Sequence, residues 1–207
     1  MAITDTKQKI LDASLLLFNE NGISNVRLQQ IADGTGISVG NLAYHFSNKE
    51  AITESLIANV IGALQDLLRQ YGKYESLNDM DFFFREFYGL CNKYRFFNCD
   101  ILEIKRNFRP SYDLLNPLFN KVKLQLERRF DICLQQRLLQ KETNIKSITS
   151  NTWFLMFFMP VDGQMNGKAP ITENTYRRRL WEYITPYFTT RGNTEYSSTI
   201  EPLFLDI

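Results

Sequence analysis

Apolar residues recur along most of this chain at intervals of three and four, which is the period of an amphipathic helix. Near the N-terminus, Ile10, Ala13, Leu17 and Phe18 form one such stripe, which ends at residues 21–22. We find no segment in which apolar and polar residues alternate as they do in a half-buried strand. The pattern therefore predicts an all-α protein of about nine helices.

Two short helices follow the first one and are joined by a glycine-containing turn. The first begins near Arg27, buries Ile31 and breaks at residues 34–36. The second begins at Ser38, a favourable N-cap, and runs to about His45. Two short helices with this connection fit the description of a helix-turn-helix.

A longer helix is predicted from Ser47 to about Gln70, opened by a capping box in which Ser47 and Glu50 satisfy each other's backbone amides.

Roughly the last dozen residues are expected to form a tail with little regular structure. Arg177 to Arg179 are expected to form a solvated face with some ion pairing. Between these segments the pattern predicts helices at residues 79–94, 100–108, 111–141, 147–159 and 173–190.

The predicted helix after Ser38 has an apolar and a polar side. At roughly 100° per residue, Leu42 and Phe46 point the same way, toward a small core. Asn41 can then offer a donor and an acceptor to a base edge, and Gly40 lets the backbone approach a groove closely. The opposite side carries Gly40, Asn41 and Tyr44, and the flanks carry Val39, Ala43 and His45.

Phosphate contacts are expected from the ends of this helix and from neighbouring helix starts. Tyr44 and His45 can donate to phosphate oxygens. For His45, the only histidine in the chain, packing inside the protein is the alternative. Lys49 lies in the first turn of the following helix, where a cation and free amides together hold a phosphate. Arg27 and Ser38 open their helices in the same way.

The charge balance weighs against non-specific coating of nucleic acid. The formal net charge is +1, and residues 1–50 carry four Lys or Arg against five Asp or Glu, a net charge of −1. Non-specific affinity depends on neutralised phosphates, so little of it is expected here. Sequence-specific binding remains open, because a few well-placed donors suffice to position a reading helix.

The string from Gly36 to Glu50 resembles the signature of the TetR family of bacterial transcriptional regulators, and the similarity extends over roughly residues 8 to 56. The resemblance implies an N-terminal three-helix DNA-binding domain at 1–50 and a helical ligand-binding and dimerisation domain at 51–207. It also implies a homodimer on a near-palindromic operator of double-stranded DNA. Ala43 departs from the family's usual Tyr. The DNA-binding candidates are Arg27, Gln29, Ser38, Val39, Gly40, Asn41, Tyr44, His45 and Lys49.

The remaining two thirds of the chain is rich in aromatic residues, which fill the core or line a pocket for a small hydrophobic or aromatic effector. The stretch from Trp153 to Met159 is apolar all round, which indicates a partner surface or burial within the monomer. The candidate pocket residues are Phe83, Phe87, Phe97, Phe108, Trp153 and Phe157.

We expect a cytoplasmic, ligand-responsive repressor with no cofactor, no metal site and no membrane span. The three cysteines are scattered and contain no CxxC pair, which favours a reducing compartment. An enzyme is disfavoured, because no nucleophile, base and orienting group can be identified together. An architectural DNA-binding protein that takes no effector is the alternative from a different class.

Overall fold

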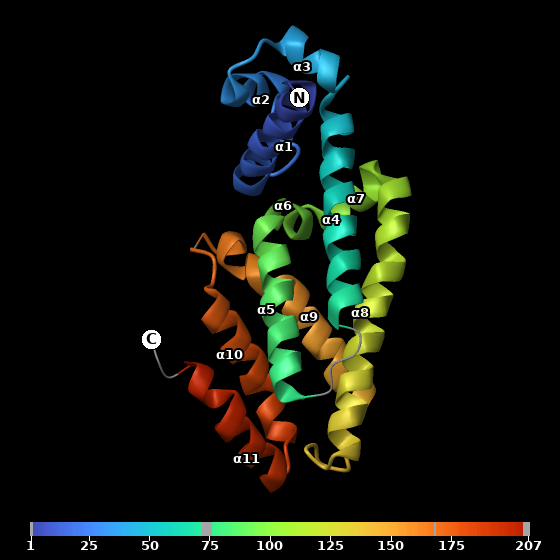
Figure 1. Cartoon of the computed structure of the whole chain (residues 1–207), viewed down its shortest axis with the longest axis vertical. Coiled ribbons are helices and arrows are strands. Elements are labelled where there is room, and N and C mark those ends of the chain that lie inside the picture. The colour runs from blue at the N-terminus through green and yellow to red at the C-terminus, as the bar shows by residue number, and fades with distance from the viewer. Residues whose placement is uncertain (1, 72–75, 168, 205–207) are drawn as a thin grey trace. The chain divides into compact units, whose positions relative to one another are not determined.

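The computed structural model describes residues 2–71, 76–167 and 169–204 (Figure 1). These ranges contain eleven α-helices and two short 3₁₀ helices, and their only β-type pairing is an isolated bridge between Leu139 and Phe188. The all-α prediction is confirmed. Two of the eleven helices, α6 and α11, were not expected from the pattern.

Contacts divide the chain into two compact units. The first comprises residues 1–63 and 94–116, and the second comprises residues 64–93 and 117–207. Helices α4 and α8 contribute residues to both units. The division of roles at residue 50 stays a prediction.

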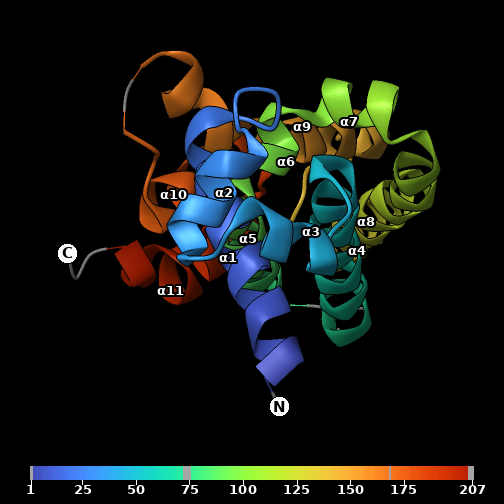
Figure 2. The same cartoon turned by 90° about the horizontal axis from the view of Figure 1, so that it is seen from above.

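The first unit is built around small helices that share one apolar core. Helix α1 packs against α2 and α6, and α2 packs against α3 (Figures 1 and 2). Ile10, Phe18, Ile31, Leu42 and Ile52 are fully buried there. Its helices are α1 (Ala2–Asn21), α2 (Leu28–Thr35), α3 (Val39–His45), the first part of α4 (Lys49–Tyr71), α6 (Arg95–Cys99), α7 (Ile101–Asn107) and the start of α8 (Arg109–Gln135).

Helices α6 and α7 hold the end of α1 and the turn that follows it. The Asn19 side chain accepts a hydrogen bond from the Phe96 amide at 2.9 Å, and the Asp100 carboxylate accepts one from the Ile23 amide at 2.8 Å. Partial burial raises the pKa of Asp100, although the bond from Ile23 opposes that shift. Helix α6 has five residues, too few for an amphipathic period to be recognised.

The second unit packs long helices around an aromatic interior. Helix α5 lies against α9, α10 and α11 (Figure 1). Phe84 meets Trp181 edge-on at 5.6 Å between ring centroids. Besides the remainder of α4 and α8, the unit contains α5 (Leu77–Lys93), α9 (Ile145–Met165), α10 (Glu173–Ile184), α11 (Thr190–Thr199) and the 3₁₀ helices Thr185–Tyr187 and Glu201–Phe204.

A buried ion pair joins α5 to α10 within this unit. The Asp81 carboxylate accepts hydrogen bonds from the Arg177 guanidinium and, at 2.9 Å, from the Trp181 indole N–H. Arg177 also donates to Glu173 at 3.1 Å. The expectation of a solvated face is therefore wrong for Arg177, whose side chain is only 9% exposed.

Four predicted boundaries are wrong, and the first is the end of α9, which runs to Met165 instead of Met159. The helix expected at 173–190 ends at Ile184, because Pro186 lacks the amide that would continue it, and Thr189 then caps α11 by accepting from the Gly192 amide. The expected tail is helical as far as Phe204, and residues 205–207 lie outside the described residues. Helix α8 stops at Gln135, before Arg137 with its left-handed φ of 61°.

The start of α4 also differs from the prediction. Asn48, not Ser47, accepts the hydrogen bond from the third helical amide, that of Ala51, at 2.8 Å. Residues 49–70 are long enough to cross a membrane and contain an 18-residue window with a mean hydropathy of 1.2, but 44% of that window is buried inside the fold. Core helices of globular proteins commonly show this combination, so α4 is weak grounds for a membrane span.

Candidate nucleic-acid interface

The turn between α2 and α3 is set by a left-handed residue and a serine cap. Gly36 has a φ of 70°, which glycine adopts without a steric penalty, and the next amide, that of Ile37, bonds back to Ala32 at 3.1 Å. Ser38 then accepts a hydrogen bond from the Asn41 amide at 3.1 Å. The chain therefore leaves one short helix and starts the next within a few residues.

Helix α3 rests on its apolar side and leaves its polar side uncovered. Leu42 is fully buried and Phe46 is 4% exposed, whereas Tyr44 is 76% exposed. Gly40 and Asn41 are exposed as well. The Asn41 side-chain amide makes no hydrogen bond with the described residues, so both its donor and its acceptor are available to a base edge.

Of the three residues on the flanks of α3, Val39 and His45 are half-buried and Ala43 is exposed. Val39 lies at the start of the helix and His45 at its end. The His45 and Tyr44 rings meet edge-on at 5.3 Å between centroids. This contact limits the rotation of both rings, which lie at the end of the exposed side.

The start of α2 also presents exposed polar residues. Arg27 is exposed, and its backbone amide donates to the Gln30 side chain at 2.8 Å. Gln29 is exposed, but its side-chain amide already donates to Asp33 at 2.7 Å. A contact from Gln29 to DNA therefore competes with an intrahelical bond.

Lys49 lies in the first turn of α4 but is turned back into the protein. Its ammonium donates to the carbonyls of Ile23 and Val26 at 2.8 and 3.0 Å. These two bonds hold the loop between α1 and α2. In this arrangement the Lys49 ammonium points at backbone carbonyls rather than at solvent, so it stabilises the loop.

Lys7 is a basic residue near α3 that sequence reasoning missed. It is exposed on α1, and its ammonium lies 5.1 Å from the centre of the Phe46 ring, at the end of α3. A cation at this edge can reach a phosphate that flanks the groove. From the sequence, Lys7 counted only as one of the charges, because no local pattern indicates that α1 and Phe46 meet.

Four of the six candidate pocket residues belong to one aromatic cluster in the second unit. Trp153 contacts Phe87 and Phe157, with ring centroids 5.9 and 5.4 Å apart. Phe83 lies 6.3 Å from Phe87, and Phe119, which was not predicted, lies 5.4 Å from Trp153. The other two candidates, residues 97 and 108, belong to the first unit. A pocket lined by these side chains stays a prediction.

The arrangement of α2, its glycine turn and α3 is a helix-turn-helix, the class of DNA-binding element in which the second helix enters the major groove. Residues 10–56 match the family model described as "Bacterial regulatory proteins, tetR family". The transcriptional repressor KstR2 of Rhodococcus jostii (strain RHA1) is 34% identical over 71 residues, which is 34% of this chain and 32% of that protein. Such matches span 26% to 49% of the curated relatives' lengths.

Solved structures extend the likeness to the whole fold. A TetR-family regulator from Marinobacter aquaeolei VT8 superposes with a TM-score of 0.78 at 21% identity, covering 94% of this chain and 97% of that one. A gamma-butyrolactone receptor (ArpA-like protein) has a TM-score of 0.71 at 15% identity and covers all of both chains. Residues 10–56 are therefore similar to the N-terminal domain of the TetR family, and the chain has the fold of these solved TetR-family regulators, as the sequence resemblance implied.

Proposed function

We propose that this protein is a cytoplasmic transcriptional repressor that binds a near-palindromic operator as a homodimer and leaves it when a small molecule binds. The observation that carries the proposal is the exposed polar side of α3, with Asn41 and Tyr44 uncovered above the buried Leu42 and Phe46. The proposal includes no catalytic activity, because the similar proteins named above are regulators.

DNA binding is assigned to short-range contacts rather than to a basic surface. Asn41 is the base-reading residue, and Gly40 permits close approach of the helix. Arg27, Ser38, Tyr44 and His45 contact phosphates, with Lys7 added at the edge. With a net charge of −1 over residues 1–50, affinity for random DNA is expected to be low.

The dimer is assigned to an exposed aromatic surface on α9 and α10. Phe154 is 59% exposed and Phe158 is 39% exposed, and their ring centroids lie 4.9 Å apart. Asn151 on α9 donates to the Tyr183 hydroxyl on α10 at 3.0 Å, which ties the two helices together on that surface. Exposed aromatic pairs of this kind favour burial against a partner, here a second copy.

The effector part of the proposal draws on the aromatic interior of the second unit and on a neighbour of the same fold that is described as a receptor for a small lactone. A small hydrophobic or aromatic molecule fits such surroundings. The proposed coupling is a change in the separation of the two reading heads, which must otherwise meet successive major grooves roughly 34 Å apart.

The operator proposal is tested by gel shifts with fragments that surround the gene for this chain, at moderate salt, followed by footprinting. We expect one or a few fragments to shift, with protection of two half-sites about one DNA turn apart. Equal retardation of all fragments would instead indicate an architectural DNA-binding protein. Absence of any shift would contradict the regulator proposal.

The dimer proposal is tested by sedimentation of the Phe154→Glu, Phe158→Glu double variant. Two carboxylates on this surface should convert the dimer to a monomer, because buried unpaired charges are costly at an interface. Leu102→Glu is the matched control, since Leu102 is 62% exposed on α7, outside this surface. A double variant that sediments as a dimer would place the interface elsewhere.

A further inference from the structure

A groove between the C-terminal part of α4 and the middle of α8 lies entirely within the second unit. Its volume is about 580 Å³, within the range of small-molecule sites. The groove is separate from the aromatic cluster around Trp153, none of whose residues line it. Its walls combine apolar side chains from Leu68, Leu118 and Leu124 with two cations.

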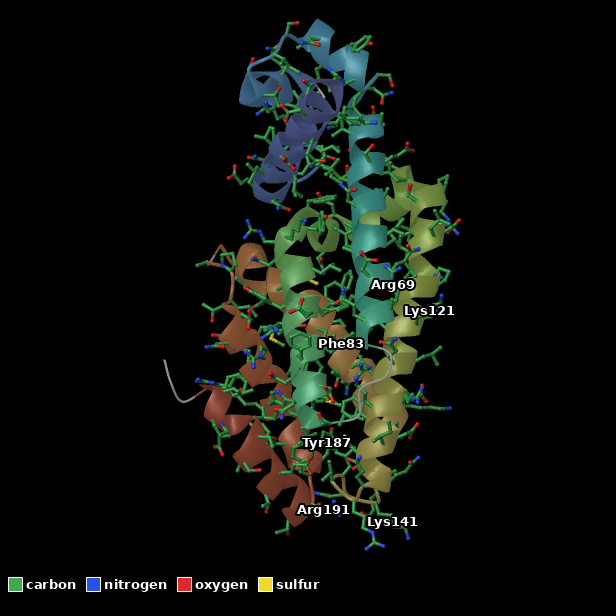
Figure 3. The ribbon with its side chains drawn as sticks, in the orientation of Figure 1. Arg69, Phe83, Lys121, Lys141, Tyr187 and Arg191 are labelled. Carbon is green, nitrogen blue, oxygen red and sulfur yellow. The ribbon has the colours of Figure 1, made fainter. Side chains whose placement is uncertain are left out.

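The two cations come from different helices, and both line the groove (Figure 3 labels them). Arg69 is on α4 and Lys121 is on α8. Arg69 pairs with Asp66 on its own helix, but both side chains are largely exposed, so that pair is weak and can be exchanged. The Lys121 ammonium makes no ion pair or hydrogen bond with the described residues, and the lining residues include no carboxylate. The groove therefore offers two positive charges to an anion.

Gln125 supplies a third recognition element. Its side-chain N–H₂ donates to the Leu68 carbonyl at 3.1 Å, near the end of α4, where carbonyls lack partners within the helix. That bond fixes the orientation of the amide, because a carbonyl accepts only from nitrogen. The Gln125 Oε1 oxygen is then buried and has no hydrogen-bond partner among the residues that the structure describes. A ligand that donates a hydrogen bond would satisfy it.

The exposed apolar wall fits the same class of ligand. Leu124 is 63% exposed, although it lies beside Gln125 and one helical turn from Lys121. An apolar chain laid along Leu118, Leu124 and Leu68 would cover this surface while its charged end reaches Arg69 and Lys121.

We infer that this groove binds an apolar carboxylic acid that also carries a hydroxyl or amide N–H. The carboxylate pairs with Lys121 and Arg69, the hydroxyl or N–H donates to Gln125 Oε1, and the apolar chain covers the leucines. That such binding releases DNA rests on the proposed function, whereas the binding itself does not.

The test is calorimetric titration of the full chain with four probes: 3-hydroxyoctanoate, octanoate, 1-octanol and inorganic phosphate. We expect 3-hydroxyoctanoate to bind most tightly, octanoate about tenfold more weakly because Oε1 stays unsatisfied, and the alcohol and phosphate at least tenfold more weakly again. Equal affinity for the alcohol would overturn the role of the cations. Equal affinity for phosphate would overturn the role of the leucines.

Variants of the groove residues test whether the ligand binds there. Lys121→Gln and Arg69→Gln should each weaken 3-hydroxyoctanoate binding by about five- to tenfold and leave thermal unfolding unchanged, because both residues are exposed. Lys141→Gln is the matched control, since it removes an equally exposed charge outside the groove (Figure 3). Unchanged binding by the Lys121 and Arg69 variants would overturn the inference.

A final arm separates this inference from the proposed function. The same probe is added to the complex of wild-type protein with its operator. Tight binding that leaves the DNA bound would retain the ligand site and contradict the effector part of the proposed function. A functional operator complex with no binding of any probe would overturn the ligand site alone.

Discussion

The surface of α3 in the first unit and the interior of the second unit differ in the exposure of their polar side chains. On α3 the residues assigned to DNA are exposed, with Tyr44 at 76%, and only their apolar support is buried. In the second unit the polar pair of Asp81 and Arg177 is buried among aromatic rings, with Trp181 fully enclosed. Substitutions on the exposed side of α3 should therefore weaken DNA binding without lowering stability. Substitutions in the interior of the second unit should lower stability without acting directly on DNA binding.

The largest effect on stability is expected from Asp81→Asn. It removes the negative charge from a buried pair and leaves Arg177 with only the partly exposed Glu173 as its counter-charge, which should cost about 3 kcal/mol in free energy of unfolding. Urea denaturation of the wild type and the variant measures this loss in free energy of unfolding. Asp113→Asn is the control, because its pair with Arg109 is exposed and should contribute less than about 1 kcal/mol. Equal losses in both variants would contradict the contrast between buried and exposed pairs.

A smaller loss is expected from Gly192→Ala at the start of α11. A Cβ atom at this position would lie 2.2 Å from the Leu138 carbonyl oxygen, so the backbone must shift, at a cost of about 1–3 kcal/mol. Gly89→Ala in α5 is the matched control. Nothing lies within 4 Å of its added Cβ, and alanine should stabilise that helix by up to about 1 kcal/mol. Thermal unfolding of the two variants should shift in opposite directions.

Variants of Ser38 separate its role as the N-cap of α3 from its proposed contact with DNA. Ser38→Ala removes the acceptor for the Asn41 amide and should cost about 1 kcal/mol. Ser38→Asp keeps a favourable cap, so stability should stay close to that of wild type, but its negative charge faces the phosphates. Operator affinity should therefore fall in both variants while stability falls in one. If Ser38→Asp binds the operator normally, Ser38 does not approach the DNA backbone.

Cys99 offers a probe that leaves the fold intact. The residue is exposed, yet desolvation and the neighbouring Asp100 carboxylate raise the pKa of its thiol to about 11 from an ordinary value of 9.0. The thiolate, which is the reactive form, should be about 100-fold scarcer at neutral pH than in an unperturbed thiol. Alkylation of Cys99 by iodoacetamide should be correspondingly slow and should accelerate up to about pH 11. A rate equal to that of free cysteine would show that the thiol is fully solvated.

Much of the first unit could be predicted from the sequence because its signals are local. The apolar positions Leu42 and Phe46 indicated the orientation of α3, Gly36 marked the end of α2, and Ser38 marked the start of α3. What local signals could not show were contacts made through the fold. Lys49 binds the carbonyls of Ile23 and Val26, which are distant in sequence, and no local pattern indicates these bonds. Its contact with a phosphate stays a prediction.

The second unit was harder to predict, because its order depends on which aromatic residues meet. The pattern identified Phe87, Trp153 and Phe157 as a group but could not place Phe119 among them or assign residues 97 and 108 to the other unit. Arg177 was expected in solvent because three consecutive arginines are usually exposed. Its burial follows from Asp81, ninety-six residues earlier, and no local pattern connects the two.

The central claim is that the exposed side of α3 reads DNA, and fluorescence anisotropy with a labelled operator at fixed salt tests it most directly. The Asn41→Ala, Tyr44→Ala double variant should bind at least about 100-fold more weakly, because both heads of the proposed dimer lose their contacts. Its free energy of unfolding should stay within about 0.5 kcal/mol of wild type, since both side chains are exposed. Asn193→Ala, an exposed change on α11, should bind like wild type. A double variant that holds the operator as tightly as this control would contradict the account.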